Sequence, residues 1–119
     1  MKSLFIAGSR KFFDDIDKLV KRCKENGIVV STAGKLLEHE DTSDSERNAL
    51  FRAFERISKS DIVYIVANKG YIGKTVALEI AYAYAKGKEI ISSEAIEDFS
   101  ARALVSKVMT KEVLINYAK

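Results

Sequence analysis

Four short apolar segments that alternate with amphipathic segments constrain the fold of this chain more than any other feature. The apolar segments are Ser3–Ala7, Ile28–Thr32, Asp61–Ala67 and Lys88–Ser92. Each has the length and the β-branched or aromatic content of a buried strand. Strands and helices in strict alternation are typical of a parallel sheet with right-handed crossovers. We therefore expect a three-layer α/β fold, flavodoxin-like or Rossmann-like, with helices on both faces of a parallel sheet in the order 2-1-3-4.

The segments between the strands have apolar residues three and four positions apart, which predicts helices. The predicted helices span Phe12–Lys24, Glu46–Lys59 and Thr75–Lys86, and the periodicity continues through Glu94–Lys119. Ser45 is the expected cap of the second helix. Its expected sheet-facing stripe consists of Leu50, Phe51, Phe54 and Ile57.

Length and composition indicate a single domain over residues 1–119. The chain has 119 residues, of which 47% are hydrophobic and 31% charged, and it contains no proline; this leaves no room for two cores or a proline-rich linker. The net charge is only +3 and is evenly spread. We therefore expect no nucleic-acid polymer as partner, whereas an anionic small ligand is compatible with this charge.

Cysteine and histidine are too few for a structural zinc site, which needs about four ligands. The chain has one of each, Cys23 and His39, and we predict neither a metal nor another cofactor. Cys23 falls on the apolar stripe of the first helix, where an inert, buried thiol is expected. With no signal peptide or membrane span visible, we expect a cytoplasmic protein without a membrane partner.

Two loops are predicted to meet where a parallel sheet of this order binds ligands, at the carboxyl ends of its first and third strands. Gly8-Ser9-Arg10 follows the first strand, and Gly70 to Thr75 follows the third. Gly8 permits a close approach to the backbone, and Ser9 and Arg10 have the groups to hold a phosphate or a sugar hydroxyl. The alternative is an ordinary strand-to-helix turn in which Ser9 caps the helix.

The second loop nearly matches the phosphate-binding pattern G-x-x-x-x-G-K-[ST] of nucleoside-triphosphate hydrolases. Asn68 stands in the place of the first glycine, and Gly73, Lys74 and Thr75 fill the last three positions. A glycine turn closed by the start of a helix explains the same residues without a triphosphate.

Glu79 stands out because its neighbours in the third predicted helix are apolar. Within two turns of the helix start, it could face the ligand crevice, where partial burial raises the pKa of a carboxyl group and alters its reactivity. Spacing alone favours a solvated helix carboxylate, as most helical Glu residues are.

Several segments together resemble the nucleoside 2-deoxyribosyltransferase superfamily, which includes deoxynucleoside-monophosphate glycosidases. They are Phe5–Arg10, Ser60–Val66, Gly70–Gly73 and Thr75–Ala83, followed by Gly87 and Lys88. The resemblance covers residues 3–92. Its most specific part is the glycine loop, with Glu79 six positions after Gly73 and then a helix of small residues.

This resemblance implies a chemistry and a set of site residues. Glu79 would be the nucleophile that attacks C1′ of a 2-deoxyribosyl group and displaces the base, without a cofactor. Residues implied to bind the substrate are Gly8, Ser9 and Arg10 on the sugar or phosphate side, Gly70, Tyr71 and Gly73 on the opposite lip, and Asn116 donated by a neighbouring subunit. Homodimers or larger homo-oligomers are expected.

One departure from the family pattern concerns the second carboxylate, which assists the departure of the base. Counting back from Asp61 without gaps, its place falls at Ala53, so Glu55, Glu46 or Asp44 would have to replace it. We predict cleavage or transfer of the N-glycosidic bond of a nucleoside or nucleotide. The alternatives are a non-catalytic nucleotide-binding or sensing module of the same fold and, third, a P-loop-like hydrolase.

Overall fold

The computed structural model describes residues 1–33 and 42–119. Its elements, in chain order, are β1 (Leu4–Gly8), the short 3₁₀ helix η1 (Arg10–Phe12), α1 (Phe13–Glu25), β2 (Val30–Thr32), α2 (Ser43–Ser58), β3 (Ile62–Val66), α3 (Lys74–Ala85), β4 (Glu89–Ser92), α4 (Phe99–Ala103), β5 (Lys107–Val108) and α5 (Lys111–Ala118). Strands and helices alternate as predicted.

The sheet is parallel and five-stranded, in the order β2-β1-β3-β4-β5. The expected order 2-1-3-4 is confirmed, and β5 extends it by one strand. β1 and β3 form the centre, pairing over their full length from Leu4 opposite Ile62 to Gly8 opposite Val66. Both are almost completely buried, as apolar runs without alternation predict for a sheet covered on both faces.

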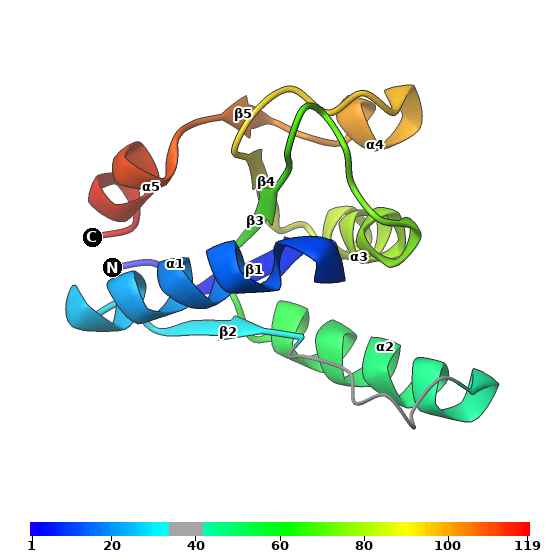
Figure 1. Ribbon diagram of the computed structural model, residues 1–119. Coiled ribbons are helices and arrows are strands. Elements are labelled where there is room, and N and C mark those ends of the chain that lie inside the picture. The colour runs from blue at the N-terminus through cyan, green and yellow to red at the C-terminus, as the bar shows by residue number, and fades with distance from the viewer. Residues whose placement is uncertain (34–41) are drawn as a thin grey trace.

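Two helical layers cover the sheet, giving the predicted three-layer α/β architecture (Figure 1). Successive strand residues point to opposite faces: Leu4 and Ile6 pack with α1 and α5, and Phe5 and Ala7 pack with α2, α3 and α4. Cys23 belongs to the first of these clusters and is fully buried, which confirms its predicted core position.

The expectation of helical structure throughout residues 94–119 is wrong in part. This segment forms α4, β5 and α5, with β5 pairing its two residues, Lys107 and Val108, to Ile91 and Ser92 of β4. Lys107 and Val108 are both exposed. A strand this short, with no buried apolar run, leaves no trace in the hydrophobic periodicity.

The start and the buried stripe of α2 also differ from expectation. Thr42, not Ser45, is the N-cap, and Ser45 completes a capping box by accepting a hydrogen bond from the Thr42 N–H at 3.0 Å. Phe51 is 60% exposed, and the buried residues of α2 are Ala53 and Ile57. His39 lies outside the described residues. No helix of residues 1–33 and 42–119 is both long and apolar enough to cross a membrane.

Candidate active site

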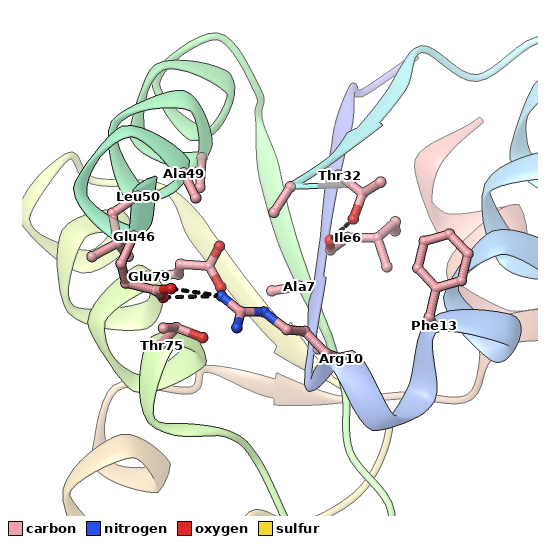
Figure 2. Close-up of a pocket in the computed structure, with 13 residues that line it drawn as sticks. Ile6, Ala7, Arg10, Phe13, Thr32, Glu46, Ala49, Leu50, Thr75 and Glu79 are labelled. Carbon is pink, nitrogen blue, oxygen red and sulfur yellow. Dashed lines mark hydrogen bonds and ion pairs between the residues drawn. The ribbon is translucent and has the colours of Figure 1, made fainter. Parts of the chain in front are cut away.

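A cavity of about 170 Å³ lies at the carboxyl ends of β1 and β2 and reaches between α2 and α3. The loop after β1, the end of β2 and the two helices form its walls (Figure 2). Its lining residues are Ile6, Ala7, Gly8, Arg10, Phe13, Thr32, Ala33, Glu46, Ala49, Leu50, Ala53, Thr75 and Glu79. Most of this lining is apolar, so the few polar and charged groups stand out.

Helical periodicity explains how two elements supply most of this wall. Glu46, Ala49, Leu50 and Ala53 are spaced so that they share one face of α2. Thr75 and Glu79 are four residues apart and share one face of α3. The cavity is therefore the space between two helix faces that carry small and medium side chains, with one carboxylate on each helix.

Glu79 is the most deeply placed charged group of the cavity, with only 5% of its surface exposed. In the part of the chain that the structure describes, its carboxylate takes part in no hydrogen bond or ion pair. Burial raises the pKa of Glu79 from 4.5 to about 7, and the nearby positive charge of Arg10 opposes this rise. The interpretation as a solvated helix carboxylate is therefore wrong, because α2 covers this face of α3.

Arg10 and Glu46 form an ion pair across the cavity. The Nη2 group of Arg10 donates hydrogen bonds to both carboxylate oxygens of Glu46, at 2.9 and 3.0 Å. Figure 2 shows the Arg10 guanidinium directed towards the side chains of Glu46 and Glu79. The site thus combines a buried carboxylate, a paired carboxylate and a shared cation.

The first predicted loop reaches the cavity with two of its three candidate residues, Gly8 and Arg10. A Cβ atom on Gly8 would lie 2.7 Å from Ile16 Cδ1, so glycine lets α1 pack closely here. Ser9 is outside the lining; it is buried and caps η1 by accepting a hydrogen bond from the Lys11 N–H. This is the helix-cap alternative considered for Ser9.

The second predicted loop contacts the first at Ser9, and of its residues only the last, Thr75, lines the cavity. Gly73 packs against Ser9, with its Cβ position 3.7 Å from Ser9 Oγ. Tyr71 makes an edge-on contact with Phe12 at 6.1 Å between ring centroids. Gly70 and Tyr71 border a separate, shallow depression together with Ile72, Glu97 and Asp98.

Asn116 lies on α5, where it is exposed, and it does not line the cavity of its own chain. Contact with the cavity of a neighbouring subunit stays a prediction.

Within the segment Asn68–Thr75, residues Asn68–Tyr71 form a tight turn, and Lys74 and Thr75 begin α3. Asn68 and Tyr71 form an antiparallel bridge, with the Tyr71 N–H donating to the Asn68 carbonyl at 3.0 Å. The Gly70 N–H donates to Glu94 Oε1 at 2.8 Å, and Gly70 has a φ of +80°, which favours glycine. These amides are already occupied, and Lys74 is outside the cavity lining, so the geometry gives no support to a triphosphate-binding loop.

Of the three proposed replacements for the second carboxylate, only Glu46 lines the cavity. Asp44 pairs with Arg47 at 3.5 Å and Glu55 with Lys59 at 3.0 Å, both on the exposed surface of α2. Ala53 does line the cavity, which places the position expected for the missing carboxylate in the cavity wall. The i, i+7 relation between Glu46 and Ala53 was the sequence signal that could have singled out Glu46.

No protein-family model matches the sequence, and no curated protein sequence matches it either. The fold nevertheless defines a class: a parallel α/β domain with a small-ligand cavity at the carboxyl edge of its sheet.

Solved structures specify this fold further. A 2-deoxyribosyltransferase from Bacillus psychrosaccharolyticus is similar with a TM-score of 0.74 and 15% identity over 97% of this chain and 91% of that one. CMP N-glycosidase of Clostridium botulinum gives a TM-score of 0.63 and 17% identity, covering 98% and 96% of the two chains. A conserved protein from Enterococcus faecalis V583 is similar with a TM-score of 0.68 and 18% identity, over 98% of this chain and 96% of that one. The chain shares its fold with two 2-deoxyribosyltransferases and a CMP N-glycosidase, as the sequence resemblance predicts.

Proposed function

We propose that this protein binds a nucleoside or nucleotide in the cavity and cleaves or transfers its N-glycosidic bond through Glu79. The observation that carries the proposal is a buried carboxylate without a hydrogen-bond partner among the described residues, facing a cavity at the carboxyl edge of the sheet. Two solved structures with this fold are named for such reactions, a 2-deoxyribosyltransferase and a CMP N-glycosidase.

The first step would be attack on the sugar. A carboxylate oxygen of ionised Glu79 forms a bond to C1′ while the bond between C1′ and the base nitrogen breaks, and the electron pair of that bond leaves with the base. The product is a glycosyl ester of Glu79. Because desolvation makes an ionised carboxylate a stronger nucleophile, the apolar surroundings of Glu79 favour this step once its proton is lost.

The second step would release the sugar. A water oxygen, or the nitrogen of another base, forms a bond to C1′, and Glu79 departs as a carboxylate. With water as acceptor, the proton that water loses balances the proton that the departing base takes up. Two displacements at C1′ retain the configuration of the sugar, so a small alcohol used as acceptor is expected to give a product with the anomeric configuration of the substrate.

Substrate contacts are proposed for the predicted residues that line the cavity, Gly8 and Arg10. Thr75 adds a hydroxyl on the Glu79 face of α3. Ser9, Gly70, Tyr71 and Gly73 lie behind or beside the cavity, so their binding roles, like the expected homo-oligomer, stay predictions.

A non-catalytic nucleotide-binding module is the second candidate, favoured by the charge state of the cavity. Within residues 1–33 and 42–119, Glu46 and Glu79 are the carboxyl groups of the lining, and both oxygens of Glu46 are engaged by Arg10. A free acid that could protonate the base is not among these residues. Such a module would bind the ligand without turning it over.

Base release separates the two candidates. The protein is incubated with deoxynucleosides, deoxynucleoside monophosphates and CMP, and free base is measured by chromatography. Proposed catalysis predicts release that Glu79→Gln abolishes, since the amide keeps the shape of the side chain and lacks the nucleophilic charge. Glu55→Gln is the matched control on the exposed face of α2 and retains release.

Binding is measured in parallel by the shift of the unfolding temperature with each ligand. A ligand that stabilises the protein but yields no free base would contradict catalysis and support the binding module.

A further inference from the structure

Glu46 occupies a position from which it could protonate the base, yet its contacts indicate another role. Each of its carboxylate oxygens accepts a hydrogen bond from Arg10. Both oxygens of Glu46 are thus engaged by one guanidinium nitrogen. Ion-pair geometry of this kind favours a carboxylate that holds its cation in place.

The cation held in this way lies beside a carboxylate in an unfavourable environment. Glu79 is buried and lines the cavity together with apolar side chains of β1 and α2, including Ala7, Leu50 and Ala53. The charged groups of the described lining are Arg10, Glu46 and Glu79. Arg10 is the one cation among them, and its attraction lowers the pKa of Glu79 against the effect of burial.

Glu46 and Glu79 place two negative charges at the same cavity from neighbouring helices, and Figure 2 shows the Arg10 guanidinium directed towards both. Without the guanidinium, Glu46 and Glu79 would repel each other, and a shared apolar site favours protonation of one of such a pair. Arg10 bonds to Glu46 through Nη2 alone, so the other N–H groups of its five-donor guanidinium can serve Glu79 or a ligand.

We propose that Arg10 is a positioning residue which, anchored by Glu46, favours the ionised form of Glu79 in its apolar wall. In this proposal Glu46 is the anchor of Arg10 and not the proton donor to the departing base. The catalytic meaning of this pair rests on the proposed function, whereas the electrostatic relation between Arg10 and Glu79 holds with or without turnover.

The test is a carboxyl ¹³C NMR titration of the protein labelled at glutamate, in the absence of substrate. The Glu79 signal is assigned by its loss in Glu79→Gln. We expect Arg10→Met to raise the midpoint of the Glu79 titration by about one pH unit or more, because a cation is lost and an acidic neighbour is unmasked. Arg10→Lys keeps the charge but not the fork, and its midpoint is expected between those of the wild type and Arg10→Met.

Arg22→Met is the matched control, because Arg22 pairs with Glu112 in an exposed ion pair away from the cavity; it leaves the Glu79 midpoint unchanged. An unchanged midpoint in both folded Arg10 variants would overturn the proposal. Since no substrate is present, this outcome is independent of whether the protein releases base.

The role of Glu46 has its own readout in base release. Gln at position 46 can still accept a hydrogen bond from Arg10 but cannot deliver a proton as an acid. Glu46→Gln is therefore expected to keep release within about tenfold of the wild type, a smaller loss than general acid catalysis normally supplies. Loss of release by a hundredfold or more, with the fold intact and the Glu79 midpoint unchanged from the wild type, would make Glu46 the proton donor and overturn its role as anchor.

Discussion

Arg10 and Glu46, 36 residues apart in the sequence, form an ion pair across the cavity, in which Arg10 Nη2 lies 2.9 and 3.0 Å from the two carboxylate oxygens. Arg10 begins η1 directly after the central strand, and Glu46 lies in the first turn of α2. Their contact fixes the distance between the loop after β1 and the helix that covers Glu79. The position of the Arg10 charge in the site therefore depends on both η1 and α2.

The stability of the protein is expected to depend on pH through Glu79. Its pKa is about 7 in the folded protein against an ordinary value of 4.5, so the folded state holds the proton more tightly than the unfolded state. The resulting stability is complete below pH 4.5 and is lost as the pH rises through 7. Glu79→Gln escapes this loss and should be more stable than the wild type at pH 8, by up to about 3 kcal/mol.

Chemical denaturation at pH 4.5 and pH 8 measures this effect. The advantage of Glu79→Gln should be small at the lower pH and clear at the higher one. An equal difference at both values would mean that Glu79 titrates normally.

The capping box of α2 is expected to support the site as well as the helix. Thr42→Ala removes the side chain that accepts the Ser45 N–H at 3.1 Å, and a lost N-cap costs about 1 kcal/mol. Because Glu46 lies in the adjoining turn, ligand affinity should fall together with the unfolding temperature. Ser58→Ala at the other end of the same helix serves as control for affinity. Unchanged stability in Thr42→Ala would contradict the cap.

Gly8 is expected to tolerate alanine only when α1 gives way. The added Cβ would lie 2.7 Å from Ile16 Cδ1 and 3.3 Å from the Val66 carbonyl oxygen, and overpacking of this kind costs about 1–3 kcal/mol. Ile16→Val removes the Cδ1 methyl group. In a double-mutant cycle on unfolding free energy, the double variant should lose less than the sum of the two single losses; simple additivity would show that Ile16 is not the obstacle.

The fold was predictable where local pattern and burial agree. β1 and β3 are apolar runs in the centre of the sheet, and α1 has a clear amphipathic stripe, so their order and layers follow from the sequence. β5 could not be predicted, because its two residues are exposed and form a strand only through their pairing with β4. Such a strand has no hydrophobic pattern.

The sequence predicted the candidate nucleophile of the site but not that a helix covers it. The resemblance singles out Glu79, but its burial depends on α2, whose residues Ala49 and Ala53 line the same cavity. That long-range contact has no local signature. The resemblance implies that Tyr71 contacts the ligand, and this stays a prediction; its ring contacts Phe12 edge-on and does not line the cavity of its own chain. The direction of a loop after it leaves a strand depends on packing that periodicity does not encode.

The cavity is expected to be the ligand site, which a larger side chain can test without touching a charge. Ala49→Leu projects from the α2 face into the cavity, one turn after Glu46. We expect it to abolish the ligand-induced rise in unfolding temperature while the unliganded protein keeps its circular-dichroism spectrum and unfolds cooperatively. Arg52→Leu, an exposed position of the same helix, should leave the ligand response unchanged; ligand binding that survives Ala49→Leu would place the site elsewhere.

Capture of the glycosyl ester tests the role of Glu79 most directly. A 2-fluoro-substituted nucleoside or nucleotide slows both displacement steps by destabilising positive charge at C1′, so the ester accumulates if its base leaves readily. The protein is digested after incubation, and the peptides are measured by mass spectrometry. The expected result is one sugar adduct on Glu79 of the wild type and none in Glu79→Gln. Base release that persists in Glu79→Gln, or an adduct on another residue, would contradict the role of Glu79 as nucleophile.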